Sequence, residues 1–257
     1  MELGTVIGIA IALLGVLGGF LMEGGNLHSL FEPSALVIVV GGSFGATCIG
    51  FSMKHATSIP LVLKNAFFTK HTDPLIMLRL IVSLAKKARQ SGILALEGEM
   101  KSVDNPFVRN ALQMVIDGTQ PELVREVLET ELDAMNIRHK AGVDFFTAWG
   151  GFLPTLGVLG TVMGLIHMME NLDDPSGMGP AIAVAFIATL YGVGFANVFM
   201  LPLASKLKLH SHEEIKTYEM VIEGILSLQA GDNPHMVSTK MRAYLSPKAK
   251  QQLALEE

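Results

Sequence analysis

Two threonines are the residues of this chain best placed for chemistry, because each lies in a long segment without charged residues. Gly157, Thr161 and Gly164 follow one another at spacings of four and three residues, which places them on one face of a helix. Thr189 lies in a similar row of small residues, formed by Ala181, Ala185, Gly192 and Ala196. A hydroxyl group on such a face can line a path for ions without itself carrying charge.

Both threonines are expected near the middle of a membrane. Counted from the outer ends of their segments, Thr161 lies about 8 residues in and Thr189 about 11, so at about 1.5 Å per residue their depths are similar. They can therefore share one cavity. The alternative is that both rows only let helices pack closely, with each hydroxyl bonded to the carbonyl four residues earlier. Spacing alone favours packing, and both interpretations stay open at this point.

The sequence excludes several classes of enzyme and metal protein. It contains no phosphate-binding G-x-x-x-x-G-K-S/T motif, no H-E-x-x-H motif and no Cys/His cluster with metal-binding spacing. We therefore expect no enzymatic activity, no cofactor and no bound metal. His167 is the one ionisable imidazole in an apolar segment, and it lies about one turn from the outer end, where side chains reach the headgroups. A histidine at the membrane interface is the favoured interpretation.

Four long segments contain no Asp, Glu, Lys or Arg: residues 3–22, 33–53, 145–169 and 178–205. Each can span a bilayer, because about 20 residues at about 1.5 Å each cross a hydrocarbon core of roughly 30 Å. The hydrophobic share of 50% and the mean hydropathy of +0.44 exceed what a soluble domain usually shows. The sequence predicts an all-α polytopic membrane protein with four transmembrane helices and a helical cytoplasmic lobe.

The distribution of basic residues predicts the orientation. All 19 Lys and Arg residues lie in residues 54–140 and 206–250, and basic residues beside membrane segments stay on the cytoplasmic side. The short acidic connectors therefore face outward, and four crossings place both termini in the cytoplasm. Four parts follow: transmembrane helices 1 and 2 (1–53), a cytoplasmic helical domain (54–144), transmembrane helices 3 and 4 (145–205), and a cytoplasmic C-terminal helix and tail (206–257).

Helical periodicity extends through the cytoplasmic domain. Helices are predicted to begin at Pro74, Pro106 and Pro121, each of which follows an Asp, Asn or Gln, and the first is predicted to end at Gly92. The pattern of the third helix reaches His139, close to the third membrane segment, so this helix can continue into the membrane.

The C-terminal region is predicted to contain one further helix. Residues 207–228 keep helical spacing, and the run Gly-Asp-Asn-Pro at 231–234 breaks it. The polar residues beyond this break are expected to be mobile.

Three runs carry a resemblance to a known family. Residues 154–165 read PTLGVLGTVMGL, residues 188–192 read ATLYG, and residues 89–97 read RQSGILALE. The first two resemble the third and fourth spans of the MotA/PomA-type flagellar stator proteins, and the third resembles part of their cytoplasmic region. The resemblance covers nearly the whole chain. The related ExbB and TolQ proteins share the Gly- and Thr-rich span but resemble a three-span plan without the Arg-to-Glu run.

The resemblance implies partners and a location. It implies a ring of five such chains around two copies of a MotB-type partner in the bacterial inner membrane, with the ion-accepting aspartate on the single membrane helix of the partner. Thr161 and Thr189 would face that aspartate. This arrangement fits the lack of any carboxylate within the apolar segments of this chain.

The resemblance also implies roles for two prolines and two charges. Pro154 and Pro202 would couple the ion step to movement, and Arg89 and Glu97 would contact the rotor switch protein FliG. Each has a simpler alternative. Either proline can serve only to kink or end a helix, Arg89 can complement a helix dipole, and Glu97 can be a solvated surface charge.

The predicted function is that of a ring-forming stator subunit that couples ion flow through its partner to torque on the rotor. One alternative is an ExbB- or TolQ-like energiser of an envelope protein. A second is a secondary transporter, against which the uncharged spans and the lack of inverted repeats count. The transported ion is H⁺ or Na⁺. Ala188 stands where some sodium-driven members of the family carry a further threonine, and the sequence does not decide between the ions.

Overall fold

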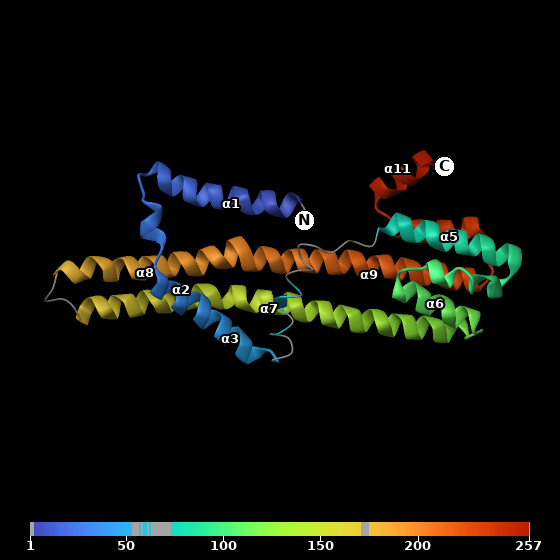
Figure 1. Ribbon diagram of the computed structural model, residues 1–257, viewed down its shortest axis with the longest axis horizontal. Helices are drawn as coiled ribbons and strands as arrows, with labels where there is room; N and C mark the ends of the chain where they lie inside the picture. The colour runs from blue at the N-terminus through green and yellow to red at the C-terminus, as the bar shows by residue number, and fades with distance from the viewer. Residues whose placement is uncertain are drawn as a thin grey trace. The chain divides into compact units, whose positions relative to one another are not determined.

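The computed structural model describes residues 3–52, 57, 59–60, 62, 73–170 and 175–256. Within these ranges every regular element is a helix, and four helical stretches are long and apolar enough to cross a membrane (Figure 1). The prediction of an all-α polytopic membrane protein is confirmed. Most of the predicted start of the cytoplasmic domain, and residues 171–174 of the second outer connector, lie outside the described residues.

The chain divides into two compact units. The membrane unit comprises Met1–Thr69 and His139–Lys208, and the lobe unit comprises Lys70–Arg138 and Leu209–Glu257. Two long helices contribute to both units, α7 (Pro121–Glu170) and α9 (Leu201–Gln229). The expected continuation of the helix that begins at Pro121 into the third membrane segment is therefore confirmed.

The membrane unit is built from apolar helices with few polar side chains. The first span is α1 (Leu3–Met22), and the second runs through α2 (Pro33–Leu36), the π-helical stretch η2 (Val37–Gly41) and α3 (Gly42–Gly50). The third lies in α7. The fourth runs through α8 (Pro175–Phe195) and the π-helical stretch η5 (Ala196–Met200) into α9.

Two small buried clusters hold the second, third and fourth spans together. One consists of Ala35, Val39, Leu153, Ile187, Ala188 and Ala196. The other joins Phe145 and Phe146 of α7 to Ala204, and the rings of Phe44 in α3 and of Phe51 just after α3 pack on Phe145. The Trp149 indole N–H donates to Ser43 Oγ at 3.0 Å, which satisfies the one polar atom that this ring carries into the cluster.

The lobe unit is a bundle of shorter helices with capped ends. It contains α5 (Pro74–Ser91), η3 (Ile93–Leu96), η4 (Met100–Ser102), α6 (Pro106–Ile116) and the first part of α7. The side chains of Asp73 and Asn105 accept backbone N–H groups at the starts of α5 and α6, and Gly92 ends α5 with φ of 83°. The predicted helix starts at Pro74, Pro106 and Pro121 and the predicted end at Gly92 are confirmed.

The expectation that the C-terminal end is mobile is wrong. Two further helices form there, α10 (Pro234–Arg242) and α11 (Pro247–Glu256), and Val237, Met241, Leu245 and Leu253 are buried in the lobe core. A Cβ atom at Gly224 of α9 would lie 2.6 Å from Met241 Sδ and 2.9 Å from Ile81 Cγ2, so this glycine lets α5 and α10 approach α9 closely. Val237, Met241 and Leu245 are spaced four residues apart and pack into the lobe core, although the segment as a whole is polar.

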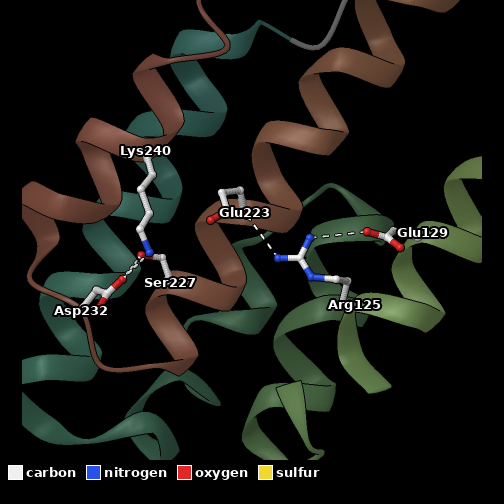
Figure 2. A network of polar contacts seen from close by, with 6 residues as sticks. All are labelled: Arg125, Glu129, Glu223, Ser227, Asp232 and Lys240. Atoms are coloured by element: carbon white, nitrogen blue, oxygen red, sulfur yellow. Dashed lines mark hydrogen bonds and ion pairs between the residues drawn. The ribbon is translucent and has the colours of Figure 1, made fainter. Parts of the chain in front are cut away.

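Polar contacts fix the turn between α9 and α10 (Figure 2). Lys240 Nζ donates to Asp232 Oδ2 at 2.8 Å, and Ser227 Oγ donates to the same oxygen at 2.5 Å. Arg125 of α7 pairs with Glu223 of α9 at 3.3 Å. The hydrogen bond from Lys240, with that from Ser227, holds the pKa of the Asp232 carboxyl below its ordinary value, and the same contact raises the pKa of Lys240.

Candidate functional site

The two predicted threonines meet between α7 and α8, which run side by side in opposite directions (Figure 1). Their hydroxyl oxygens lie 2.5 Å apart. Thr161 Oγ1 also lies 2.9 Å from the carbonyl oxygen of Ala185 on α8 and 3.1 Å from that of Gly157 on its own helix. The two residues, which were predicted to lie at similar depth, are therefore in direct contact. Both side chains are half-buried.

The hydrogens of this pair can be assigned from donor counting. A hydroxyl has one hydrogen, so Thr161 can donate to only one of the two carbonyls within reach. The Ala185 oxygen is the nearer of the two. Thr189 can then donate its own hydrogen to Thr161 Oγ1, and the lone pairs of Thr189 Oγ1 stay available to a cation or to a hydrogen-bond donor. The pair thus offers oxygen ligands without a formal charge.

The small residues around the pair bring the two backbones into contact. A Cβ atom at Gly192 would lie 2.7 Å from the Leu153 carbonyl oxygen and 3.0 Å from Gly157 Cα. A Cβ atom at Gly164 would lie 2.9 Å from Ala185 Cβ. The packing interpretation therefore describes the rows of glycine and alanine, and this close approach is what places the two hydroxyls face to face. The packing and ion-path interpretations are compatible with each other.

The two predicted prolines lie on neighbouring segments of the same helix pair. Pro154 has no N–H, so the Gly150 carbonyl lacks its helical donor, although α7 continues through this point. A Cβ atom at Gly150 would lie 2.6 Å from Leu201 Cδ2, one residue before Pro202. Pro202 is the second residue of α9, one residue beyond the end of the π-helical stretch η5, and the helix continues beyond it. Both prolines thus stand where helical hydrogen bonding departs from the regular pattern.

The two predicted charges lie in the lobe unit, on either side of the turn between α5 and η3. Arg89 occupies the last turn of α5, as expected, and Glu97 follows η3; both are exposed. The ion pair in this region joins Lys87 to Glu99. Within the described ranges neither Arg89 nor Glu97 has an ion-pair partner. Leu94 between them is 74% exposed, so an apolar side chain stands beside both charges.

The apolar segments 3–22, 33–53, 145–169 and 178–205 contain no carboxylate that could bind an ion. Among the residues that the structure describes, no group of three His, Cys, Asp or Glu side chains could hold a metal. His167 lies near the C-terminal end of α7, where its Nδ1 is 3.6 Å from a carboxylate oxygen of Glu170. This position agrees with the interpretation of an interfacial histidine.

Two polar residues of the fourth span, Tyr191 and Asn197, were not among the predicted site residues. The Tyr191 hydroxyl donates to the Leu30 carbonyl at 2.6 Å and accepts the Glu32 N–H at 3.1 Å, which ties the start of the second span to α8. Asn197 in η5 is exposed. A tyrosine that is half-buried in a membrane segment needs a partner for its hydroxyl, and an asparagine in such a segment is unusual for the same reason. Both were recognisable by type, although their partners were not.

Comparisons with known proteins agree with this geometry. The profile of the MotA/TolQ/ExbB proton channel family matches residues 99–220, and that of the Motility protein A N-terminal region matches residues 6–92. Motility protein A of Treponema phagedenis is 38% identical, over 100% of this chain and 98% of its own length.

Two solved structures have the same fold. The structure of C. jejuni MotAB matches with a TM-score of 0.91 and 28% identity, over 96% of this chain and 97% of that one. The flagellar MotAB stator complex from Bacillus subtilis matches with a TM-score of 0.89 and 36% identity, over 98% of both chains. The resemblance of the three sequence runs is thereby confirmed, and the chain belongs to the Motility protein A family within the wider MotA/TolQ/ExbB proton channel family.

Proposed function

We propose that this chain is the ring-forming subunit of an ion-driven flagellar stator, and that it works with a MotB-type partner. The observation that carries the proposal is the contact between Thr161 and Thr189, which lie in two apolar segments, 145–169 and 178–205, that contain no carboxylate. The similarity to two MotAB structures over almost the whole chain supports the same function. The family consists of channel and stator subunits and not of enzymes.

The partner supplies the acid that the spans of this chain lack. A carboxylate in the membrane is costly when charged, so an ion that neutralises it changes its interactions with the surrounding helices. In the proposed assembly, five copies of this chain surround two copies of the partner in the bacterial inner membrane. The oxygens of the Thr161–Thr189 pair face the aspartate of the partner. The transported ion is H⁺ or Na⁺, and no cofactor takes part.

Coupling to movement is assigned to the segments around the two prolines. Ion binding biases an interface that has more than one packed arrangement. Pro154 and Pro202 lie where helical hydrogen bonding is interrupted, so local bending there costs less than in a regular helix. The exposed Arg89 and Glu97 then contact the rotor protein FliG. Both charged side chains are exposed, and among the described residues neither has an ion-pair partner that would compete with a rotor contact.

Motility of the living cell separates this function from its main alternative. Deletion of the gene should abolish swimming while envelope transport stays normal. An ExbB- or TolQ-like energiser would show the reverse pattern. Swimming speed measured against sodium concentration at fixed pH, with and without an uncoupler, identifies the ion.

The threonine pair is tested by a change that keeps its shape. Thr189→Val removes one hydroxyl and should reduce ion flux and torque while the complex still assembles with its partner. Flux equal to that of the wild type would leave Thr189 with a packing role alone.

The orientation has a direct chemical test. A single cysteine at Asn26, in a Cys48→Ala background, should react with an impermeant maleimide added from outside, whereas a cysteine at Gln90 should not. Labelling at Gln90 in intact cells would contradict the inward placement of the lobe unit and of the rotor contact.

A further inference from the structure

The exposed faces of the third and fourth spans each carry a polar side chain within an apolar segment. Asn197 is exposed in η5, and its Nδ2 donates one hydrogen to the Val193 carbonyl at 2.9 Å. Thr155 is exposed on α7, and its hydroxyl donates to the Phe152 carbonyl at 2.7 Å. Within the described ranges, the second Nδ2 hydrogen of Asn197 has no acceptor. Lipid chains offer none, so an amide on a lipid-facing surface would be costly.

These two residues lie on opposite sides of the helix pair. Thr155 is two residues from Gly157, which corresponds to a rotation of about 200° around α7 from the contact with α8. Asn197 is five residues from Gly192, or about 140° around the fourth span from its contact with α7. Large apolar side chains accompany both, on α7 Val158, Leu159, Val162 and Ile166, and on α8 Phe186, Leu190 and Val193.

The two residues also lie at similar depth. The two helices run in opposite directions, and both Thr155 and Asn197 lie between the Gly157–Gly192 contact and the Gly150–Leu201 contact. Their depths differ by no more than about one helical turn, roughly 5 Å. A ring formed by rotation about an axis normal to the membrane preserves depth, so the α7 face of one copy meets the α8 face of the next at the same level.

We infer that these faces form the interface between neighbouring copies of this chain, and that Asn197 Nδ2 of one copy donates its second hydrogen to Thr155 Oγ1 of the next. The Thr155 hydrogen is engaged with its own helix, so its oxygen acts as the acceptor. Both side chains keep their internal bonds. The inference rests on the proposed ring of copies and adds to it the faces that meet and the polar contact that sets their register.

Cysteine cross-linking in the assembled complex tests this contact. In a Cys48→Ala background, with the MotB-type partner coexpressed, Thr155→Cys and Asn197→Cys on the same chain should give, on mild oxidation, a ladder of covalent oligomers of this chain. The matched control is Val162→Cys with Asn197→Cys. Val162 shares the exposed face of α7 but lies about 10 Å away along the helix, so this pair should give at least tenfold less product.

Two outcomes would overturn the inference. One is a disulfide between the cysteine at position 197 and a cysteine series on the partner helix, with no ladder, which would turn this face toward the partner. The other is an equal ladder from the control pair. The mass of the native complex is measured in parallel: an intact oligomer without a ladder contradicts only this interface, whereas a single-copy complex contradicts the proposed ring itself.

A second measurement does not depend on cysteines. Asn197→Ala and Thr155→Ala should each weaken association between copies by about threefold, because a hydrogen bond between membrane helices is modest. The double variant should weaken association no further, since both changes remove the same bond. Additive losses would show that the two residues do not interact.

Discussion

The two units of this protein bury their apolar residues in different ways. In the lobe unit, one continuous core takes residues from α5, α6, α7, α9, α10 and α11, and it includes fully buried Ile81, Leu112 and Met241. In the membrane unit, no described residue of α1 is buried, and large apolar side chains of α7 and α8 point outward. The lobe buries a continuous core within one copy, whereas the membrane unit presents apolar surfaces that lipid or other chains must cover.

The forces that hold the units together differ accordingly. Removal of apolar side chains from water drives the packing of the lobe. That force is missing between helices in lipid, where small residues and close backbone contact take its place. The Gly157–Gly192 contact and the Thr161–Thr189 hydrogen bond are contacts of this second kind.

The largest effect is expected from a cavity in the lobe core. Leu112→Ala should destabilise the lobe by about 2–5 kcal/mol, because Leu112 is fully buried and its neighbours cannot fill the space. Leu14→Ala, at a residue of α1 that is 72% exposed, should cost less than about 1 kcal/mol. Hydrogen exchange of the amides around each substituted residue in the purified complex measures the difference. Equal effects would contradict the exposure of α1.

A smaller effect is expected from an added methyl group between membrane helices. Gly192→Ala puts a Cβ atom 2.7 Å from the Leu153 carbonyl oxygen, and such overpacking costs about 1–3 kcal/mol. Gly194→Ala is the matched control, since a Cβ atom there meets nothing within 4 Å and should favour the helix. Thermal unfolding of the detergent-solubilised complex should separate the two variants. A stable Gly192→Ala complex would rule out the close backbone contact.

The third prediction concerns pH and the turn between α9 and α10. The pKa of Asp232 is lowered in the folded lobe by Lys240 and Ser227, so its contribution to stability is present above its ordinary pKa and is lost as the pH falls through the lowered value. Asp232→Asn should therefore be less stable than the wild type at neutral pH, with a difference that shrinks in acid. Exchange rates of α10 amides between pH 3 and pH 7 measure this; a difference independent of pH would contradict it.

The smallest effect on stability is expected at the exposed charges. Arg89→Glu should cost at most about 1 kcal/mol through the dipole of α5. It should nevertheless reduce motility in a way that depends on salt, because exposed charges govern encounter more than folding. Ion flux and assembly should stay normal, and charge reversal on FliG should restore swimming. Normal torque in the Arg89→Glu variant would contradict the rotor contact and leave Arg89 with only an interaction with the helix dipole.

Much of this architecture was predictable because it follows from local rules. The uncharged segments, the Asp and Asn caps before Pro74 and Pro106, and the end of α5 at Gly92 each depend on a few neighbouring residues. The facing threonines were predictable in depth, because helical rise is constant, but their hydrogen bond was not.

What the sequence did not reveal depends on contacts between distant parts of the chain. The order of α10 requires Met241 to pack on Gly224 and Ile81, and the environment of Tyr191 requires Leu30 of the preceding connector. The polar composition of the C-terminal end led to the wrong prediction that it is mobile. The spacing of Val237, Met241 and Leu245 already indicated a buried helix face.

The central claim is that this chain provides an uncharged path and that another chain provides the acid. The most direct test measures ion flux into vesicles that contain this chain alone, the MotB-type partner alone, or both. Flux should require both proteins, and it should vanish when the membrane aspartate of the partner is replaced by asparagine. Flux through vesicles that contain only this chain would contradict the claim, because no residue in its spans would then account for the relay.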